Sequence, residues 1–268
     1  MFPVGPCLSL DDLMSSSARI HQIMVKNPKL LTVNTLRQIK SHLEQTNKIL
    51  VLHAPYSVNL AHSSRSPIGS NSISIMLAQI ELAQNLATRH SVSVVFHVGK
   101  TVSMQPDEAI ANFTTNLETI LEKSLKYSSK VRILLETPAG QGTEMFVKLS
   151  ELLGVFEQFK HYSHFGLCLD TCHTWSAGLD FETLFSPVYN QRLIESVKLV
   201  HLNDSQTAFH SKVDRHANLG HGSIFRDQNL LSRVVQWCYH AKIPIILETD
   251  STHHAHEIKM IYKIIGQS

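Results

Sequence analysis

Short apolar runs alternate with longer amphipathic stretches along all 268 residues, and this alternation most constrains the fold. The apolar runs are rich in β-branched residues and end in polar residues, which predicts strands. The predicted strands cover residues 1–5, 20–25, 49–54, 92–98, 131–137, 166–171, 197–203 and 244–249. Apolar residues at helical spacing predict helices over residues 35–43, 72–89, 106–126, 145–159, 180–194, 226–241 and 256–265.

Strands that alternate with helices form a parallel sheet, because crossover helices join parallel neighbours. Continuous apolar runs at 133–135 and 245–247 are typical of strands buried on both faces. Eight such units in a chain of this length predict an α/β fold, a (β/α)₈ TIM barrel, as a single domain over residues 1–268. No Gly-x-Gly-x-x-Gly motif follows a predicted strand, so we expect no nucleotide cofactor.

Composition says more about the cellular compartment of the protein than about the molecule it binds. Charged residues make up 17% of the chain and the formal net charge is +2, which alone does not indicate nucleic-acid binding. Four cysteines are too few for a disulfide scaffold of this size. The sequence has no secretory leader pattern and no apolar run near 18 residues. We therefore expect a soluble intracellular monomer that is neither secreted nor membrane-bound, in the cytoplasm, the nucleus or, for a viral source, the virus particle.

Metal-ligand residues recur where the predicted strands end. The candidates are His53, His97, Glu136, Asp170, His173, His201, Asp214, His216 and Glu248. A single histidine or carboxylate at a strand end is more often a loop or cap residue. Such residues recur here at six consecutive strand ends, however, and coincidence is a poor explanation for that. In a barrel these strand ends converge on one face. Nine donors suit two or three metal ions with bridging carboxylates, and mixed nitrogen and oxygen donors favour zinc or manganese over magnesium. We interpret Cys168 and Cys172 as buried thiols rather than ligands.

Five short strings then identify a family resemblance. They are Glu-Thr-Pro-Ala-Gly-Gln-Gly at 136–142, Asp-Thr-Cys-His at 170–173, His-Leu-Asn-Asp at 201–204, Val-Asp-Arg-His at 213–216 and Leu-Glu-Thr at 247–249. In this order they closely resemble the zinc-dependent endonuclease IV family of apurinic/apyrimidinic endonucleases. The resemblance runs from about residue 50 to about residue 250, and the first 30 residues match poorly.

The resemblance implies a barrel that holds three zinc ions. By position, the first is held by His53, His97 and Glu136, the second by Glu136 as a bridge with Asp170, His201 and Glu248, and the third by His173, Asp214 and His216. The implied partner is double-stranded DNA with abasic sites. The implied reaction cleaves the phosphodiester 5′ to the abasic site in base excision repair, leaving a 3′-hydroxyl and a 5′-deoxyribose phosphate. A 3′-end-cleaning phosphodiesterase activity is a further expectation. We place the attacking water near Glu136 and Glu248, the catalytic candidates.

Residues for DNA contact follow from the same resemblance. Tyr56 matches a family tyrosine that penetrates the double helix, but Ser57 stands where a large apolar residue is usual. Lys29 replaces a common arginine and lacks its planar fork. Further candidates for phosphate contact are Lys100, Lys212 and Arg215, for each of which solvated surface charge is the alternative.

Two departures from the family pattern stand near the expected site. Cys7, in Gly5-Pro6-Cys7, replaces a family histidine, and His221, in Gly220-His221-Gly222, replaces a usual glutamate. Neither departure removes one of the nine metal-ligand candidates.

Two other classes of function compete with the nuclease. A barrel sugar isomerase or epimerase with one or two divalent ions would explain Glu136, Asp170, His201 and Glu248, but it does not need the third group of donors or Tyr56. A DNA-binding module without activity should have lost ligands, and this chain keeps a full set.

Overall fold

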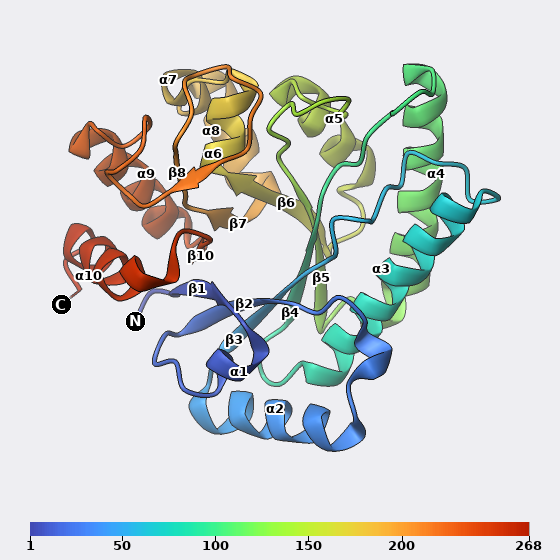
Figure 1. Ribbon diagram of the computed structural model, residues 1–268, viewed down its shortest axis with the longest axis horizontal. Coiled ribbons are helices and arrows are strands. Elements are labelled where there is room, and N and C mark those ends of the chain that lie inside the picture. Colours follow the sequence, from blue (N-terminus) through green and yellow to red (C-terminus); the bar gives the residue numbers. More distant parts are fainter. Residues whose placement is uncertain (268) are drawn as a thin grey trace.

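The computed structural model describes residues 1–267 and shows a closed barrel of parallel strands surrounded by helices (Figure 1). The barrel strands are β1 (Val4–Leu8), β2 (Ile20–Met24), β3 (Ile49–His53), β4 (Val92–Phe96), β5 (Val131–Glu136), β6 (Phe165–Asp170), β7 (Val197–His201) and β10 (Ile245–Leu247). They neighbour one another in chain order, and β10 closes the ring against β1. A short antiparallel pair, β8 (Asp204–Ser205) and β9 (His216–Ala217), follows β7 outside the barrel. The predicted TIM barrel is confirmed.

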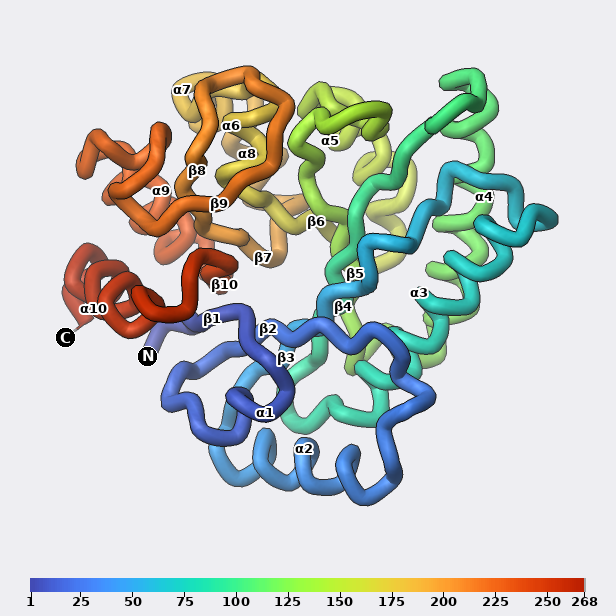
Figure 2. Tube along the Cα trace, in the orientation of Figure 1, coloured from blue at the N-terminus to red at the C-terminus, as the bar shows by residue number. Residues whose placement is uncertain are grey.

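Helices lie outside the barrel. They are α1 (Leu10–Leu13), α2 (Val33–Thr46), α3 (Pro67–Leu86), α4 (Pro106–Ser124), α5 (Leu149–Phe159), α6 (Thr171–Ala177), α7 (Phe181–Leu184), α8 (Pro187–Ser196), α9 (Gln228–Ala241) and α10 (His254–Ile264). Three short 3₁₀ turns add η1 (Pro28–Leu30), η2 (Leu125–Tyr127) and η3 (Ser251–His253). The two chain ends lie side by side (Figure 2), where Tyr262 Oη donates to the Phe2 carbonyl at 3.0 Å. Within residues 1–267, no helix has both the length and the apolar character needed to cross a bilayer.

Several predicted bounds differ from the observed ones, and three of these differences have a clear local cause. The helix predicted over 180–194 is two helices, because Pro187 lacks an N–H and starts α8 anew. Thr171, predicted to end a strand, begins α6, which Asp170 caps by accepting the His173 N–H at 2.8 Å. The first strand lies at Val4–Leu8 rather than at 1–5. Position 5 of this strand requires glycine, because an added Cβ would lie 1.7 Å from the Ile20 carbonyl oxygen of β2.

Two apolar cores hold the barrel together. The larger one lies between the strands and the helices, and the smaller one fills the barrel. The inner core consists of Ile20, Val51, Val95, Leu134, Cys168, Leu199 and Ile246, all at most 1% exposed. Burial of each large aliphatic side chain stabilises the fold by roughly 1.5–3 kcal/mol. These residues also fix which side chains face the barrel axis at its carboxyl end.

Candidate metal centre

Strand alternation carries the inner core directly into a ring of polar side chains. Successive side chains of a strand point to opposite faces, so the residue two positions beyond each inner-core residue faces the axis again. These residues are Gln22, His53, His97, Glu136, Asp170, His201 and Glu248. They meet at the carboxyl mouth, the end of the barrel where all parallel strands finish.

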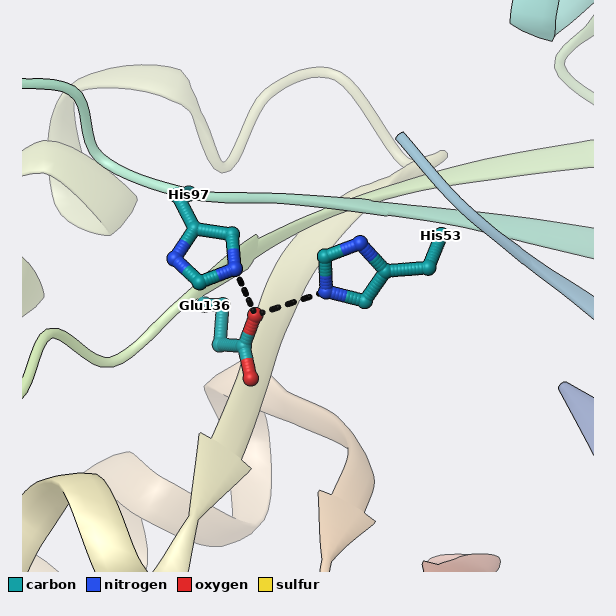
Figure 3. Close-up of side chains that lie close together, drawn as sticks. All are labelled: His53, His97 and Glu136. Atoms are coloured by element: carbon teal, nitrogen blue, oxygen red, sulfur yellow. Dashed lines mark hydrogen bonds and ion pairs between the residues drawn. The ribbon is translucent and has the colours of Figure 1, made fainter. Parts of the chain in front are cut away.

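The first donor group joins three strands. His53 Nε2 lies 3.2 Å and His97 Nε2 lies 3.3 Å from the same oxygen, Oε2 of Glu136 (Figure 3). Both rings point at this oxygen from the ends of β3 and β4. The other ring nitrogen of His53 donates to the Ala54 carbonyl at 2.8 Å, which fixes the ring.

The second group surrounds a fully buried imidazole. His201 Nδ1 lies 2.7 Å from Glu136 Oε1, 3.2 Å from Glu248 Oε2 and 3.8 Å from Asp170 Oδ2. Its Nε2 bonds the Oε1 of Gln22 at 2.8 Å, and the amide of Gln22 donates to Glu248 Oε1 at 2.5 Å. Gln22 therefore orients both the ring and one of its carboxylate neighbours.

The third group comes from a helix start and a loop. His173 lies in the first turn of α6, whereas Asp214 and His216 lie in and next to the connection from β8 to β9. His173 Nε2 is 3.2 Å from Asp214 Oδ2, and His216 Nε2 is 3.1 Å from Asp214 Oδ1. The His216 Nε2 atom is buried and makes no directed hydrogen bond in the described part of the chain.

The hydrogen bonds of the rings show that this donor set fits metal ions. The far nitrogens of His53, His173 and His201 donate to the oxygens of Ala54, Thr137 and the Gln22 amide. Each near nitrogen then carries a lone pair in the neutral ring, and it faces a carboxylate oxygen at 2.7 to 3.2 Å. Two electron-rich atoms at this distance repel unless a proton or a cation lies between them. Three groups of such donors, each within 4.8 Å, could hold metal ions.

The pKa shifts at the carboxyl mouth also indicate that its carboxylates are stabilised by nearby positive charge. Burial favours a neutral Glu136, yet His201 and His97 hold the pKa of this carboxyl well below its usual range. Burial opposes charge on His173, but Asp170 and Asp214 raise its pKa well above the ordinary value. The pKa of His216 rises to about 9, against burial, because of Asp214 and Asp170. Without metal, protons take the place of cations in this cluster.

A second buried amide was missed by the sequence analysis, as Gln22 was. Asn203 Nδ2 donates to Asp170 Oδ2 at 2.7 Å, and its Oδ1 accepts the Glu248 N–H at 2.9 Å. Strand alternation from Ile20 could have revealed Gln22, because it predicts the same inward face. The sequence analysis placed Asn203 in the strand predicted over 197–203 and in the string His-Leu-Asn-Asp, but it did not assign the amide a role beside the metal-ligand candidates.

The cysteines near the mouth are thiols. Burial raises the pKa of Cys168 to about 12 and that of Cys172 to about 11, although both sulfurs lie within 4.8 Å of donor groups. Cys7, on β1, is partly buried beside Gln22, whose amide points at its sulfur at 3.8 Å. Burial and then Glu248 raise the pKa of Cys7 to about 11. A neutral thiol thus stands where the sequence resemblance led us to expect a histidine.

His221 lies on an exposed loop that is tightly anchored below. The buried Asp204 carboxylate accepts the N–H groups of Gly220, Gly222 and Ile224 at 2.8 to 3.1 Å. The anchoring fixes the path of the loop and leaves His221 facing solvent beside His253, with ring centroids 6.0 Å apart.

Tyr56 stands at the rim of the carboxyl mouth. Its side chain is 70% exposed, and its ring centroid lies 5.0 Å from that of His97 and 5.8 Å from that of His53. Ser57 beside it is also exposed, and Lys29 lies on η1 next to Leu30, which is 77% exposed. An exposed aromatic ring above the donor groups is therefore available to a ligand.

The remaining DNA-contact candidates are also exposed. Lys100 pairs with Glu144 at 3.7 Å, and the carboxylate partly offsets the positive charge of the lysine. Lys212 lines an open cavity of about 660 Å³ with Gly140 and His210. Arg215 donates to the carbonyl of Asp214, so its guanidinium stays close to the third donor group.

Comparison with known proteins places the chain in a family. Residues 21–264 match the family described as xylose isomerase-like TIM barrel. A protein of Mycoplasma genitalium named probable endonuclease 4 is 37% identical over 207 residues, which is 76% of this chain and 67% of that protein. A protein of the same name from Mesomycoplasma hyopneumoniae strain J is 35% identical over 75% of this chain and 69% of its own length.

A solved structure confirms the fold independently. Endonuclease IV from Thermus thermophilus aligns with a TM-score of 0.77 at 24% identity, over 99% of this chain and all of that chain. The ordered motifs, the barrel and these matches agree, and the chain belongs to the endonuclease IV family of xylose isomerase-like TIM barrels.

Proposed function

We propose that this protein is a zinc-dependent endonuclease that cleaves duplex DNA on the 5′ side of abasic sites, leaving a 3′-hydroxyl and a 5′-deoxyribose phosphate. The observation that carries the proposal is the third donor group, His173, Asp214 and His216, beside the two groups that share Glu136. A sugar isomerase needs no such third group. Two relatives are named probable endonuclease 4, and these names support the same activity.

The donor set suits zinc, with five imidazoles and four carboxylates in three adjoining groups. In this proposal His53, His97 and Glu136 hold one ion, Glu136, Asp170, His201 and Glu248 hold a second, and His173, Asp214 and His216 hold a third. Bound zinc would neutralise the phosphate, lower the pKa of an attacking water and stabilise the leaving oxygen.

The protein side chains supply geometry and exclusion of water. Gln22 and Asn203 hold the carboxylates of Glu248 and Asp170, so the acceptor atoms do not reorganise when the phosphate binds. Glu136 and Glu248, whose carboxylates both face Nδ1 of His201, are the catalytic carboxylates of the proposal. Tyr56 fills the space left by the missing base, where it stacks in the duplex and favours extrusion of the abasic sugar.

The proposed partner is double-stranded DNA, bound by a monomer at the carboxyl mouth. Lys29, Lys100, Lys212 and Arg215 are the proposed backbone contacts, and each contributes to a salt-dependent affinity. Ser57 is too small to act as an apolar wedge, so Leu30 next to Lys29 is the available apolar tip on that side. The same chemistry extends to blocked 3′ ends, which present a similar phosphodiester. We expect the protein to be located with the DNA that it repairs, inside a cell or in a virus particle.

The test combines metal counting with incision. Purified protein is analysed for metal and incubated with a duplex that carries one tetrahydrofuran abasic analogue. About three zinc ions per chain and a single cut 5′ to the analogue are expected. An intact duplex under conditions where an endonuclease IV cuts it would refute the nuclease. One or two manganese or magnesium ions, with turnover of a ketose or aldose, would support the isomerase instead.

A further inference from the structure

The opposite end of the barrel contains a second charged cavity. This amino mouth, where the parallel strands begin, has a cavity of about 330 Å³. Its apolar floor includes Ile49, Val51 and Leu199, the last two of which belong to the inner core. The inner core therefore separates two polar mouths, and the amino mouth is distinct from the candidate metal centre.

Cations dominate the walls of this cavity. Arg132 faces the axis because it lies two positions before Leu134 on β5. Arg89, Lys198 and Lys242 also line the cavity, and no aspartate or glutamate of residues 1–267 does. Arg19 lies close enough, together with Arg89, to lower the pKa of His90 after burial has done so. Five cations thus gather at one mouth of a chain whose net charge is only +2.

These cations have few counter-charges. In the part of the chain that the structure describes, lysine and arginine form ion pairs through Lys100, Lys148, Lys160, Arg192 and Arg233, and not through the five cations of the amino mouth. Burial and then Arg132 lower the pKa of Lys198, and Glu195 offsets this only in part. The Nε atom of Arg19 is buried and has no hydrogen-bond partner among residues 1–267. Like charges held together in this way raise the local concentration of anions.

The shape of the cavity restricts the class of anion. A single inorganic phosphate is much smaller than 330 Å³, which lies at the lower end of the range of small-molecule sites. The apolar floor offers a surface for a ring, and the guanidinium fork of Arg132 matches a phosphate. We propose that the amino mouth binds an organic phosphate of mononucleotide size, whose phosphate contacts Arg132 and Lys242 while its ring lies on the apolar floor.

The experiment measures binding of a fluorescent nucleotide, methylanthraniloyl-ADP, to the metal-loaded protein by anisotropy at low ionic strength. The wild type should bind it saturably. The double variant Arg132→Gln/Lys242→Gln should bind at least about tenfold more weakly, because it removes two charge-assisted contacts to the phosphate. Both side chains are exposed, so the variant should keep the melting temperature of the wild type.

A matched control removes two exposed cations elsewhere, as Arg37→Gln/Lys123→Gln on α2 and α4, and should bind within about twofold of the wild type. A competition series then identifies the ligand class. ADP should displace the probe, whereas inorganic phosphate and adenosine at equal concentration should not. A duplex with a tetrahydrofuran site should leave the probe bound.

Four results would overturn the proposal: no saturable binding, equal binding by the Arg132→Gln/Lys242→Gln variant, equal displacement by inorganic phosphate, or displacement by the duplex. None of these measurements depends on incision, so they neither assume nor test the proposed nuclease activity.

Discussion

The two mouths of the barrel are made by the same strands, yet they collect opposite charge. At the carboxyl mouth four carboxylates converge on five imidazoles, and the far nitrogens of three of these rings are already committed to oxygen acceptors. At the amino mouth Arg89, Arg132, Lys198 and Lys242 surround a cavity whose described walls hold no carboxylate. Each mouth concentrates a charge that its own side chains do not fully balance.

The difference between the mouths shows how a barrel separates its functions. The apolar inner core, with residues such as Val95 and Leu134, lies between the two mouths and excludes water from the barrel axis. Metal-ligand residues occur where strands end and loops can add further donors, as the loop with Asp214 does. At the amino mouth, by contrast, the charged side chains that line the cavity are long arginine and lysine side chains.

The largest expected effect is at the carboxyl mouth. Glu248→Gln should reduce incision of the tetrahydrofuran duplex by at least about a thousandfold, because the neutral amide removes one negatively charged donor from the second group. Binding of the duplex should persist, since the DNA-contact candidates are untouched. Both quantities can be measured on one sample by gel incision and anisotropy. Incision at the wild-type rate would refute the role of Glu248.

The next effect concerns pH and the metal-free protein. The pKa of His216 is raised from 6.5 to about 9 in the fold. Its stabilising contribution is therefore fully present below about pH 6.5 and is lost as pH rises through about 9, by up to about 3 kcal/mol. Thermal melts of chelator-treated protein should show this loss between pH 6.5 and pH 9. His216→Gln should reduce this pH dependence without abolishing it, because the pKa of His173 is also raised. An unchanged slope in the variant would contradict the assignment.

A smaller effect is expected at the buried amide that supports the carboxyl mouth. Gln22→Met should weaken zinc affinity by about 10- to 100-fold, because His201 and Glu248 both lose the hydrogen bonds that orient them. The matched control is Gln79→Met, which removes a buried amide whose hydrogen bond goes to the Val25 carbonyl and not to a metal-ligand candidate. Competition with a chromophoric chelator measures both affinities. Equal affinities would show that Gln22 has no positioning role.

The smallest effect tests whether the mouths are independent. Arg132→Gln/Lys242→Gln should change incision by less than about twofold, because the inner core separates these cations from the metal-binding donors and distant sites act additively. Steady-state kinetics on the tetrahydrofuran duplex measure this directly. A large loss of incision would mean that charge at the amino mouth contributes to DNA binding, and the contrast between the mouths would have to be redrawn.

Local rules predicted much of the fold and several members of the site. The continuous apolar run of β5 and the polar residue that ends it predicted both a buried strand and the position of Glu136. The helix over 180–194 was wrong because tertiary packing and Pro187 start a second helix after a short first one. The strand at 1–5 was misplaced because the role of Gly5 in close packing against Ile20 depends on a neighbouring strand.

The sequence by itself determined the barrel, through alternation of strands and helices, and the identity of the candidate donors, through their positions at strand ends. Only the tertiary structure decided which nitrogen of His201 faces the carboxylates, that Gln22 and Asn203 hold them, and that Arg132 and Lys242 meet across the amino mouth. The physical reason is that alternation along one strand is a local property. Hydrogen bonds and charge clusters between strands depend on the register that closes the ring.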